Sequence, residues 1–156
     1  MRILVVSDSH GDEEAVWRAV ETQPSAGAVI HLGDGAREFE AVAARYPDKR
    51  FYNVRGNGDW GCHTIPDTGE ELFSGRRVFF THGHLYGVKT GLYRVVCAAR
   101  ERKADILLFG HTHMPLEDYE EGLFILNPGS IAHGGSYGIV DITPAGVVTN
   151  VVENRL

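Results

Sequence analysis

Two histidines stand one residue apart in the stretch LLFGHTHMP, directly after an apolar run and just before a proline. A His-x-His pair is by itself a weak signal, because polar residues are common in the loops that follow strands. Polar residues follow apolar runs in the same way elsewhere in the chain. The complete set is Asp8, His10, Asp34, Asn57, His82, His111 and His113.

These side chains form a mixed oxygen and nitrogen ligand set, with two carboxylates, four imidazoles and one amide carbonyl but no cysteine. Such a set suits Mn²⁺, Fe²⁺, Zn²⁺ or Co²⁺ rather than a soft thiolate site. Seven ligands exceed the needs of one transition ion, which suggests two ions roughly 3.5–4 Å apart that share a bridging carboxylate. Asp34 is the natural bridge in this set.

The elements that must position these residues are strands that end next to them. Apolar runs predict strands at 3–6, 28–34, 50–56 and 105–110, and the strand that ends at His82 belongs to a predicted hairpin at 71–83. Ligands in open α/β sheets lie beyond the carboxyl ends of strands, so the seven side chains are expected to meet at one edge. Asp8 and His10 are two residues apart, as are His111 and His113, and in extended backbone each pair would point to one side.

Three segments with helical spacing of apolar residues complete the pattern, at 13–22 after a capping Asp12, at 36–47 and at 90–102. After residue 60, further hairpins are predicted at 116–129 and 137–152. Strand–helix repeats followed by hairpins predict an α/β domain with mixed sheets, in which two sheets pack face to face with helices outside.

Length and composition limit the class of protein. A chain of 156 residues fits one domain, expected to span 1–156. Its 15 Lys and Arg against 21 Asp and Glu leave a formal charge of −6, which argues against a general nucleic-acid-binding surface but not against a small phosphate ligand. The apolar run before Asp8 is too short for a signal peptide or a membrane span, so we expect a cytoplasmic protein without membrane association. Cys62 and Cys97 are expected to be free thiols, with Cys97 in the core.

The motifs D-x-H, G-D, G-N, H-G and G-H-x-H occur in this order from Asp8 to His113. As an ordered set they resemble the calcineurin-like metallophosphoesterases, especially the small prokaryotic phosphodiesterases, over nearly the whole chain. The resemblance implies a single metallophosphoesterase domain, a four-layer α/β/β/α sandwich with two mixed sheets. It implies one metal held by Asp8, His10, Asp34 and His113, and another held by Asp34, Asn57, His82 and His111.

The implied activity is that of a metal-dependent phosphoric ester hydrolase, in which a metal-bridging hydroxide attacks a phosphodiester. The cofactors would be two divalent ions, with Mn²⁺ favoured and Ni²⁺, Co²⁺, Fe²⁺ or Zn²⁺ as alternatives. The substrate would be a small-molecule or nucleotide phosphodiester, and a homo-oligomer is compatible with this assignment. Asn57 would also orient a phosphate oxygen, whereas His84 could either contact the substrate or turn outward.

One departure from the family pattern concerns the general acid. Many superfamily members carry a histidine directly after the asparagine, thought to protonate the leaving group, and this chain has Gly58 there. His63 could supply the proton, although a solvated loop histidine is the simpler interpretation. Arg55 and Asp59 could position the asparagine motif or form an ordinary ion pair and turn cap, and His31 is expected to be a packed, hydrogen-bonded residue rather than a ligand.

Two alternative functions remain open at this point. A phosphomonoesterase or protein phosphatase would use a similar centre, and the retromer subunit with this fold is a protein-binding scaffold rather than an enzyme. A scaffold has no physical need for seven converging ligands, and this chain has all seven, which favours the hydrolase.

Overall fold

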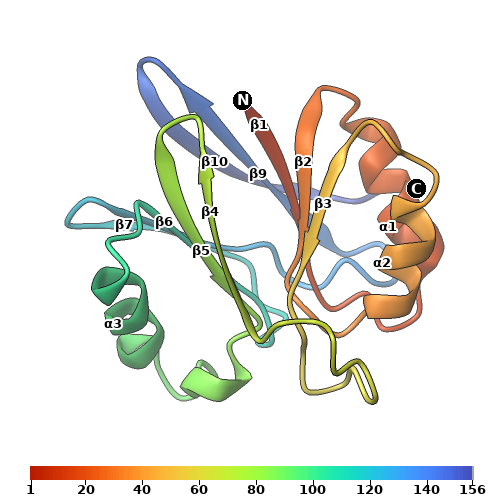
Figure 1. The fold of residues 1–156 in the computed structure, drawn as a ribbon, viewed down its shortest axis with the longest axis horizontal. Coiled ribbons are helices and arrows are strands. Elements are labelled where there is room, and N and C mark those ends of the chain that lie inside the picture. Colours follow the sequence, from red (N-terminus) through yellow and green to blue (C-terminus); the bar gives the residue numbers. More distant parts are fainter. Residues whose placement is uncertain (156) are drawn as a thin grey trace.

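The structure is a computed structural model that describes residues 1–155. It contains two five-stranded sheets that pack face to face, with helices on both outer sides, so four layers are visible in Figure 1. The first sheet has the order β10 (Gly146–Glu153), β9 (Ser136–Thr143), β1 (Arg2–Val6), β2 (Ala26–His31) and β3 (Arg50–Asn53). The second has the order β4 (Thr68–Phe73), β5 (Arg76–Thr81), β6 (Ile106–Phe109), β8 (Leu123–Asn127) and β7 (Leu116–Glu120).

Both sheets are mixed, as the sequence predicts. In the first sheet β1, β2 and β3 are parallel, while β9 is antiparallel to β1 and to β10. In the second sheet β5, β6 and β8 are parallel, and the hairpin partners β4 and β7 run antiparallel at its two edges. The carboxyl ends of the parallel strands are therefore available in both sheets to carry functional residues.

The alternation of side chains along each strand divides the core into three layers. In β1, Ile3 and Val5 point into the layer between the two sheets, whereas Leu4 points toward the helices. In β6, Leu108 enters the central layer and Leu107 packs on the helical side of the second sheet. Because these strands are buried on both faces, they appear in the sequence as continuous apolar runs.

Helices α1 (Glu13–Thr22) and α2 (Ala36–Ala43) cover the first sheet, and α3 (Tyr93–Glu101) covers the second (Figure 1). Helix α1 has its predicted bounds, and the Asp12 side chain accepts a hydrogen bond from the Ala15 N–H at its N-terminus. A short 3₁₀ helix, η1 (His84–Tyr86), follows β5.

Three expectations about the helices are wrong, and the first is the start of α3, which begins at Tyr93 rather than at 90. Helix α2 ends at Ala43 rather than at 47, and the residues that follow it make turn hydrogen bonds before Pro47, which disfavours helical backbone in the residue preceding it. Cys97 is half-exposed rather than part of the core, because α3 buries only a narrow stripe around Val95 and Ala99. Both cysteines are free thiols, as expected.

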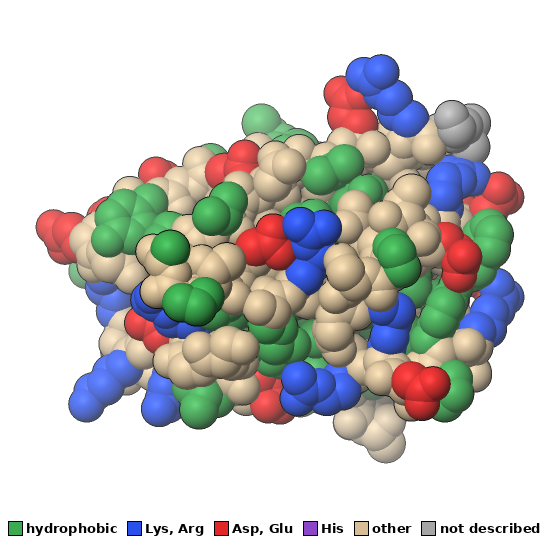
Figure 2. Space-filling model, turned by 90° about the horizontal axis from the view of Figure 1, so that it is seen from above, with side chains coloured by type: hydrophobic (Ala, Val, Ile, Leu, Met, Phe, Trp, Pro, Cys, Tyr) green, Lys and Arg blue, Asp and Glu red, His purple; other side chains and the backbone are tan. Residues whose placement is uncertain are grey.

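Within residues 1–155, every helix is too short or too polar to cross a membrane. Figure 2 shows the molecule from above, where acidic and basic side chains are interspersed among apolar and other groups. This view looks onto the end of the molecule where β1 begins, so the carboxyl ends of the parallel strands of the first sheet lie at the opposite end.

Candidate metal centre

The loops after five strands bring the seven candidate ligands together. Asp8 follows β1, Asp34 follows β2, Asn57 follows β3, and His82 comes directly after β5. His111 and His113 both follow β6. Backbone hydrogen bonds join these loops, from the Asp8 N–H to the Gly33 carbonyl and from the Gly110 N–H to the His82 carbonyl. The expected convergence of distant residues at one edge is therefore present.

The first group of side chains surrounds the carboxylate of Asp8. His113 Nε2 lies 3.1 Å from Asp8 Oδ1, and His10 Nε2 lies 3.7 Å from the same oxygen. The two imidazole nitrogens face each other at 3.3 Å. Asp8 itself is buried, while the two histidines are exposed, so the group opens to solvent on the histidine side.

The second group surrounds Nε2 of the buried His82. Asn57 Oδ1 lies 3.0 Å from this nitrogen, His111 Nδ1 lies 3.1 Å away, and Asp34 Oδ2 lies 3.4 Å away. Asp8 Oδ1 is 3.9 Å from the same atom, so Asp8 links the two groups. The sequence singles out Asp34 as the shared carboxylate, whereas Asp8 is the one found in both possible metal-binding groups, Asp8–His10–His113 and Asp8–Asp34–His82.

The chemistry of this arrangement fits bound cations. His82 Nδ1 lies 2.7 Å from the Leu32 carbonyl and donates to it, so Nε2 is the atom that faces the centre. The amide oxygen of Asn57 and the carboxylate of Asp34 can only accept there. Facing acceptors repel one another unless a proton or a metal ion lies between them, and a divalent cation satisfies all of them together.

The pKa values of these groups reflect the same crowding. Burial would raise the pKa of Asp34, but His82 and the Gly58 N–H outweigh burial and lower it to about 2. Burial would lower the pKa of His82, but contacts with Asp34 and Asp8 outweigh it and raise that pKa. Burial and the neighbouring His82 lower the pKa of His111, which favours the neutral imidazole that metal binding requires.

Five of the seven residues have left-handed backbone, contrary to the extended pairs expected from the sequence. The φ angles are 54° at Asp8, 43° at His10, 60° at Asp34, 69° at His111 and 60° at His113. This conformation is uncommon outside glycine, costs of order 1–3 kcal/mol per residue and clusters at functional sites. The expectation of extended pairs is wrong because the chain reverses at the strand ends, so His111 turns to His82 while His113 turns to Asp8.

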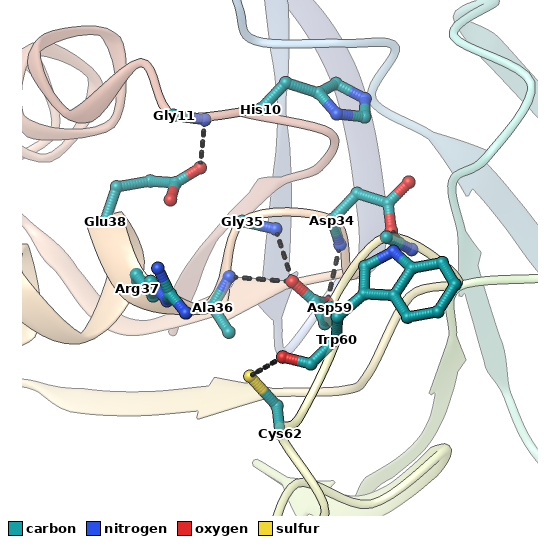
Figure 3. Close-up of a pocket in the computed structure, with 11 residues that line it drawn as sticks. His10, Gly11, Asp34, Gly35, Ala36, Arg37, Glu38, Asp59, Trp60 and Cys62 are labelled. Carbon is teal, nitrogen blue, oxygen red and sulfur yellow. Dashed lines mark hydrogen bonds between the residues drawn. The ribbon is translucent and has the colours of Figure 1, made fainter.

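Asp59 fixes the loops that carry two of these residues. Its carboxylate accepts four backbone hydrogen bonds, from Asp34, Gly35, Ala36 and Gly56, at 2.8–3.1 Å. Two of these donors belong to the N-terminus of α2, so Asp59 caps that helix from a distant loop (Figure 3). The sequence leaves open whether Asp59 caps a turn or positions the asparagine motif, and the structure shows that one carboxylate does both.

A buried series of hydrogen bonds, which the sequence did not reveal, supports the loop after β1. The Gly33 N–H donates to His31 Nδ1, which leaves the proton on Nε2 to donate to Ser9 Oγ. Ser9 in turn donates to Glu38 Oε1, which also accepts from the Gly11 N–H. His31 is therefore a hydrogen-bonded residue rather than a ligand, as expected. The sequence gives little indication that Glu38 has this role, since a carboxylate near a helix N-terminus is ordinarily solvent-exposed.

The remaining candidates lie beside the centre. His84, His63, Arg55 and Trp60 line a hollow of about 230 Å³ together with Asn57. His84 is turned toward the centre, with its ring 5.3 Å from that of His82, and its Nδ1 atom is buried without a hydrogen-bond partner in the described part of the chain. His63 is exposed. Of the two alternatives for His84, the structure therefore shows the inward orientation.

The backbone at Gly58 leaves little room for the histidine found in other family members. The Gly58 N–H donates to Asp34 Oδ1 at 2.6 Å, and a Cβ atom on this residue would lie 3.0 Å from the same oxygen. A side chain here would press against the carboxylate of Asp34. The backbone N–H of Gly58 therefore supports Asp34, and a side chain at this position would require the carboxylate to shift slightly.

Comparison with known proteins identifies the family. Residues 1–144 match the calcineurin-like phosphoesterase superfamily domain, so the chain belongs to this family, and its two mixed sheets with outer helices are the metallophosphoesterase fold. The chain is 36% identical over 136 residues to the probable metallophosphoesterase YsnB of Bacillus subtilis, a match that covers 84% of this chain and 75% of YsnB. It is 31% identical over 168 residues to the phosphodiesterase YfcE of Escherichia coli, with 90% and 88% of the two chains covered.

Solved structures give the same result. A predicted phosphoesterase from Streptococcus pneumoniae superposes with a TM-score of 0.84 at 27% identity, covering 98% of this chain and 89% of the other. Proteins named vacuolar protein sorting-associated protein 29 are also found among the relatives and among the structures with this fold. The fold is thus shared by proteins with enzymatic and with non-enzymatic names.

The four hydrogen bonds of Asp59 give a prediction for metal affinity and stability. Asp59→Asn replaces one acceptor oxygen by an N–H₂ group that faces backbone donors, so we expect a loss of about 1–3 kcal/mol in the free energy of unfolding. Because the loop of Asp34 loosens, the affinity for Mn²⁺ should fall about 10- to 100-fold. Urea unfolding and calorimetric titration with Mn²⁺ measure the two effects. Asp48→Asn, at an exposed aspartate, is the matched control, and equal behaviour of the two variants would contradict this role for Asp59.

The buried His31 gives a prediction for pH. Burial lowers its pKa from 6.5 to about 4, so the folded protein keeps it neutral while the unfolded chain binds a proton below pH 6.5. The unfolded state therefore binds more protons between about pH 4 and 6.5, and stability is lost as the pH falls through this window, by up to about 3 kcal/mol. Urea unfolding of the chelator-treated protein at pH 7 and 4.5 measures the loss. His31→Gln keeps a donor and an acceptor without titrating, and an equal loss in this variant would show that His31 is not the cause.

Proposed function

We propose that this protein is a phosphodiesterase that uses two divalent metal ions to hydrolyse small phosphodiesters. The observation that supports it is the ring of acceptor atoms around His82 Nε2, which a cation would satisfy. When bound, the two ions would neutralise charge on phosphoryl oxygens and activate a water molecule as the nucleophile. The proposed ligands of one ion are Asp8, His10, Asp34 and His113, and those of the other are Asp34, Asn57, His82 and His111.

The protein's own groups would position the substrate. Asn57 turns its amide oxygen to His82, which leaves its N–H₂ group to donate to a phosphate oxygen. His84 has a buried Nδ1 atom without a partner, and burial together with the neighbouring His82 lowers its pKa. A neutral His84 is suited to hydrogen-bond the substrate rather than to act as a strong acid near pH 7. Asp59 and the left-handed loops would hold these groups in place before the substrate arrives.

A non-catalytic scaffold is the alternative that the relatives named vacuolar protein sorting-associated protein 29 raise. The loss of folding stability that this centre causes argues against a scaffold. Five strained residues and the buried carboxylate of Asp8 lower stability, and a binding platform gains nothing from them. The phosphodiesterase YfcE supports a diester over a monoester as the substrate class.

The proposed metal is supported by the ligand types, and the proposed compartment is supported by the cysteines. A centre of carboxylates, imidazoles and one amide, without thiolate, suits Mn²⁺, with Ni²⁺, Co²⁺, Fe²⁺ or Zn²⁺ as alternatives. Two free cysteines suit a reducing environment, which supports a cytoplasmic location. Residues 1–156 would act as one domain.

The metal ligands give the direct test of this function. Metal-stripped protein, reloaded with Mn²⁺, Ni²⁺, Co²⁺, Zn²⁺ or Mg²⁺, should hydrolyse bis(p-nitrophenyl) phosphate faster than p-nitrophenyl phosphate. Asp34→Asn and His111→Ala should lose at least about a thousandfold in rate, because they remove several kcal/mol of charge stabilisation, while circular dichroism shows an intact fold. His133→Ala, at an exposed loop histidine, is the control. Full activity of chelator-treated Asp34→Asn would exclude a metal-dependent reaction.

The absence of a histidine at position 58 gives a prediction for the leaving group. Without a positioned acid the departing oxygen carries its own charge, so aryl diesters should react far faster than alkyl diesters, by more than the roughly 10²- to 10⁴-fold worth of a general acid. His63→Ala should leave this ratio unchanged. Rates for a series of leaving groups in both proteins measure the effect. If wild type shows no dependence on the leaving group, or if His63→Ala selectively slows alkyl diesters, an acid is present after all.

A further inference from the structure

A cavity of about 330 Å³ lies directly beside the candidate metal centre, with Asp34 and His10 in its wall. We propose that this cavity binds the nucleotide part of the substrate, with a planar base stacked on Trp60 and an anionic group paired with Arg37. The proposal rests on the proposed function, since it assigns the substrate class of that same centre. The volume of the cavity is in the range of sites that hold small ligands.

The cavity is built from the two loops that also position Asp34. One wall is the first turn of α2 with Arg37 and Glu38, and the other is the segment from Gly58 to Cys62 with Trp60. In the view of Figure 3, Arg37 and the indole of Trp60 lie on opposite sides, with His10 above and Cys62 below. A ligand between Arg37 and Trp60 would therefore reach the residues of the metal centre.

The acidic groups of the wall are already occupied by protein donors. Glu38 accepts from Ser9 Oγ and from the Gly11 N–H, Asp59 accepts four backbone N–H groups, and Asp34 faces His82. Arg37 is exposed and makes neither an ion pair nor a side-chain hydrogen bond within residues 1–155. Among the described residues, Arg37 is thus the charged group of this wall that has no protein partner, and a guanidinium pairs with phosphate oxygens through two hydrogen bonds.

Trp60 supplies the second recognition element. Its side chain is 85% exposed, although tryptophan is among the largest apolar residues and is usually buried to a high degree. The residue before it, Asp59, accepts hydrogen bonds from the Asp34 and Gly56 N–H groups, so the ring follows directly after an anchored position of the loop. An exposed aromatic face across a cavity from a cation can stack a nucleic-acid base while the cation pairs with an anionic group.

Binding of nucleoside monophosphates tests the role of Trp60 without requiring hydrolysis. The probes are AMP and ribose 5-phosphate, which differ only in the base, titrated into the full-length Zn²⁺-loaded protein. A Trp17→Phe background removes the other tryptophan, so that fluorescence reports Trp60. We expect AMP to quench the fluorescence and to bind about 5- to 150-fold more tightly than ribose 5-phosphate, as stacking on one aromatic ring predicts. Calorimetry should show that this preference is lost in Trp60→Ala.

A second pair of ligands tests Arg37. Adenosine 3′,5′-bisphosphate should bind more tightly than AMP to wild type, and Arg37→Ala should remove this gain. Arg94→Ala, which removes an exposed arginine of α3, is the matched control and should retain it. Equal affinities for AMP and ribose 5-phosphate in wild type, or an unchanged preference in Trp60→Ala, would overturn the proposal. An unchanged gain in Arg37→Ala would also overturn it.

A kinetic comparison separates this proposal from the proposed function. Trp60→Ala should lower kcat/KM for the p-nitrophenyl ester of thymidine 5′-phosphate more than for methyl p-nitrophenyl phosphate, which carries no base. Equal losses for the two esters would count against the proposal. If neither ester is hydrolysed with any metal while AMP still binds more tightly than ribose 5-phosphate through Trp60, the function fails and the nucleotide site stands.

Discussion

The mutual repulsion of acceptor atoms is the constraint on which this structure depends. Oxygen atoms of Asp34 and Asn57 and a ring nitrogen of His111 crowd around His82, and ring nitrogens of His10 and His113 crowd around Asp8. Such atoms stay close only if the backbone that carries them cannot relax. Three features supply that rigidity, because each fixes a loop rather than a single side chain. They are the left-handed loops, the carboxylate of Asp59, and the buried hydrogen bonds that join His31, Ser9 and Glu38.

The two-sheet fold determines how many loops can meet at one place. The carboxyl ends of β1, β2 and β3 come from one sheet, and those of β5 and β6 come from the other. Packing the sheets face to face brings these ends together above the central apolar layer. A single sheet would align its loops along a line, whereas two sheets surround a point, as the proposed pair of cations would require.

Much of the fold and the set of candidate ligands could be predicted from the sequence, because both depend on local patterns. Buried strands such as β6 appear as unbroken apolar runs, and polar residues such as His111 directly follow them. The backbone at these residues could not be predicted, since an apolar run marks the strand but does not give the left-handed angles that Asp8 and His113 adopt after it. The same holds for Glu38 and for the dual role of Asp59, because their distant partners lie 23 to 29 residues away in the sequence.

The loop between β3 and β4 carries residues of the candidate metal centre and of the proposed binding cavity. It carries Asn57 at the centre, Asp59 as the support of Asp34, and Trp60 in the wall of the cavity, within four consecutive positions. Because Asp59 accepts hydrogen bonds from both Gly56 and the loop of Asp34, a change in Trp60 would alter the proposed binding cavity while these hydrogen bonds remain. The loop can therefore vary in specificity while the constraints that hold the acceptor atoms together remain the same. The carboxylate of Asp59 is the element that separates these two roles.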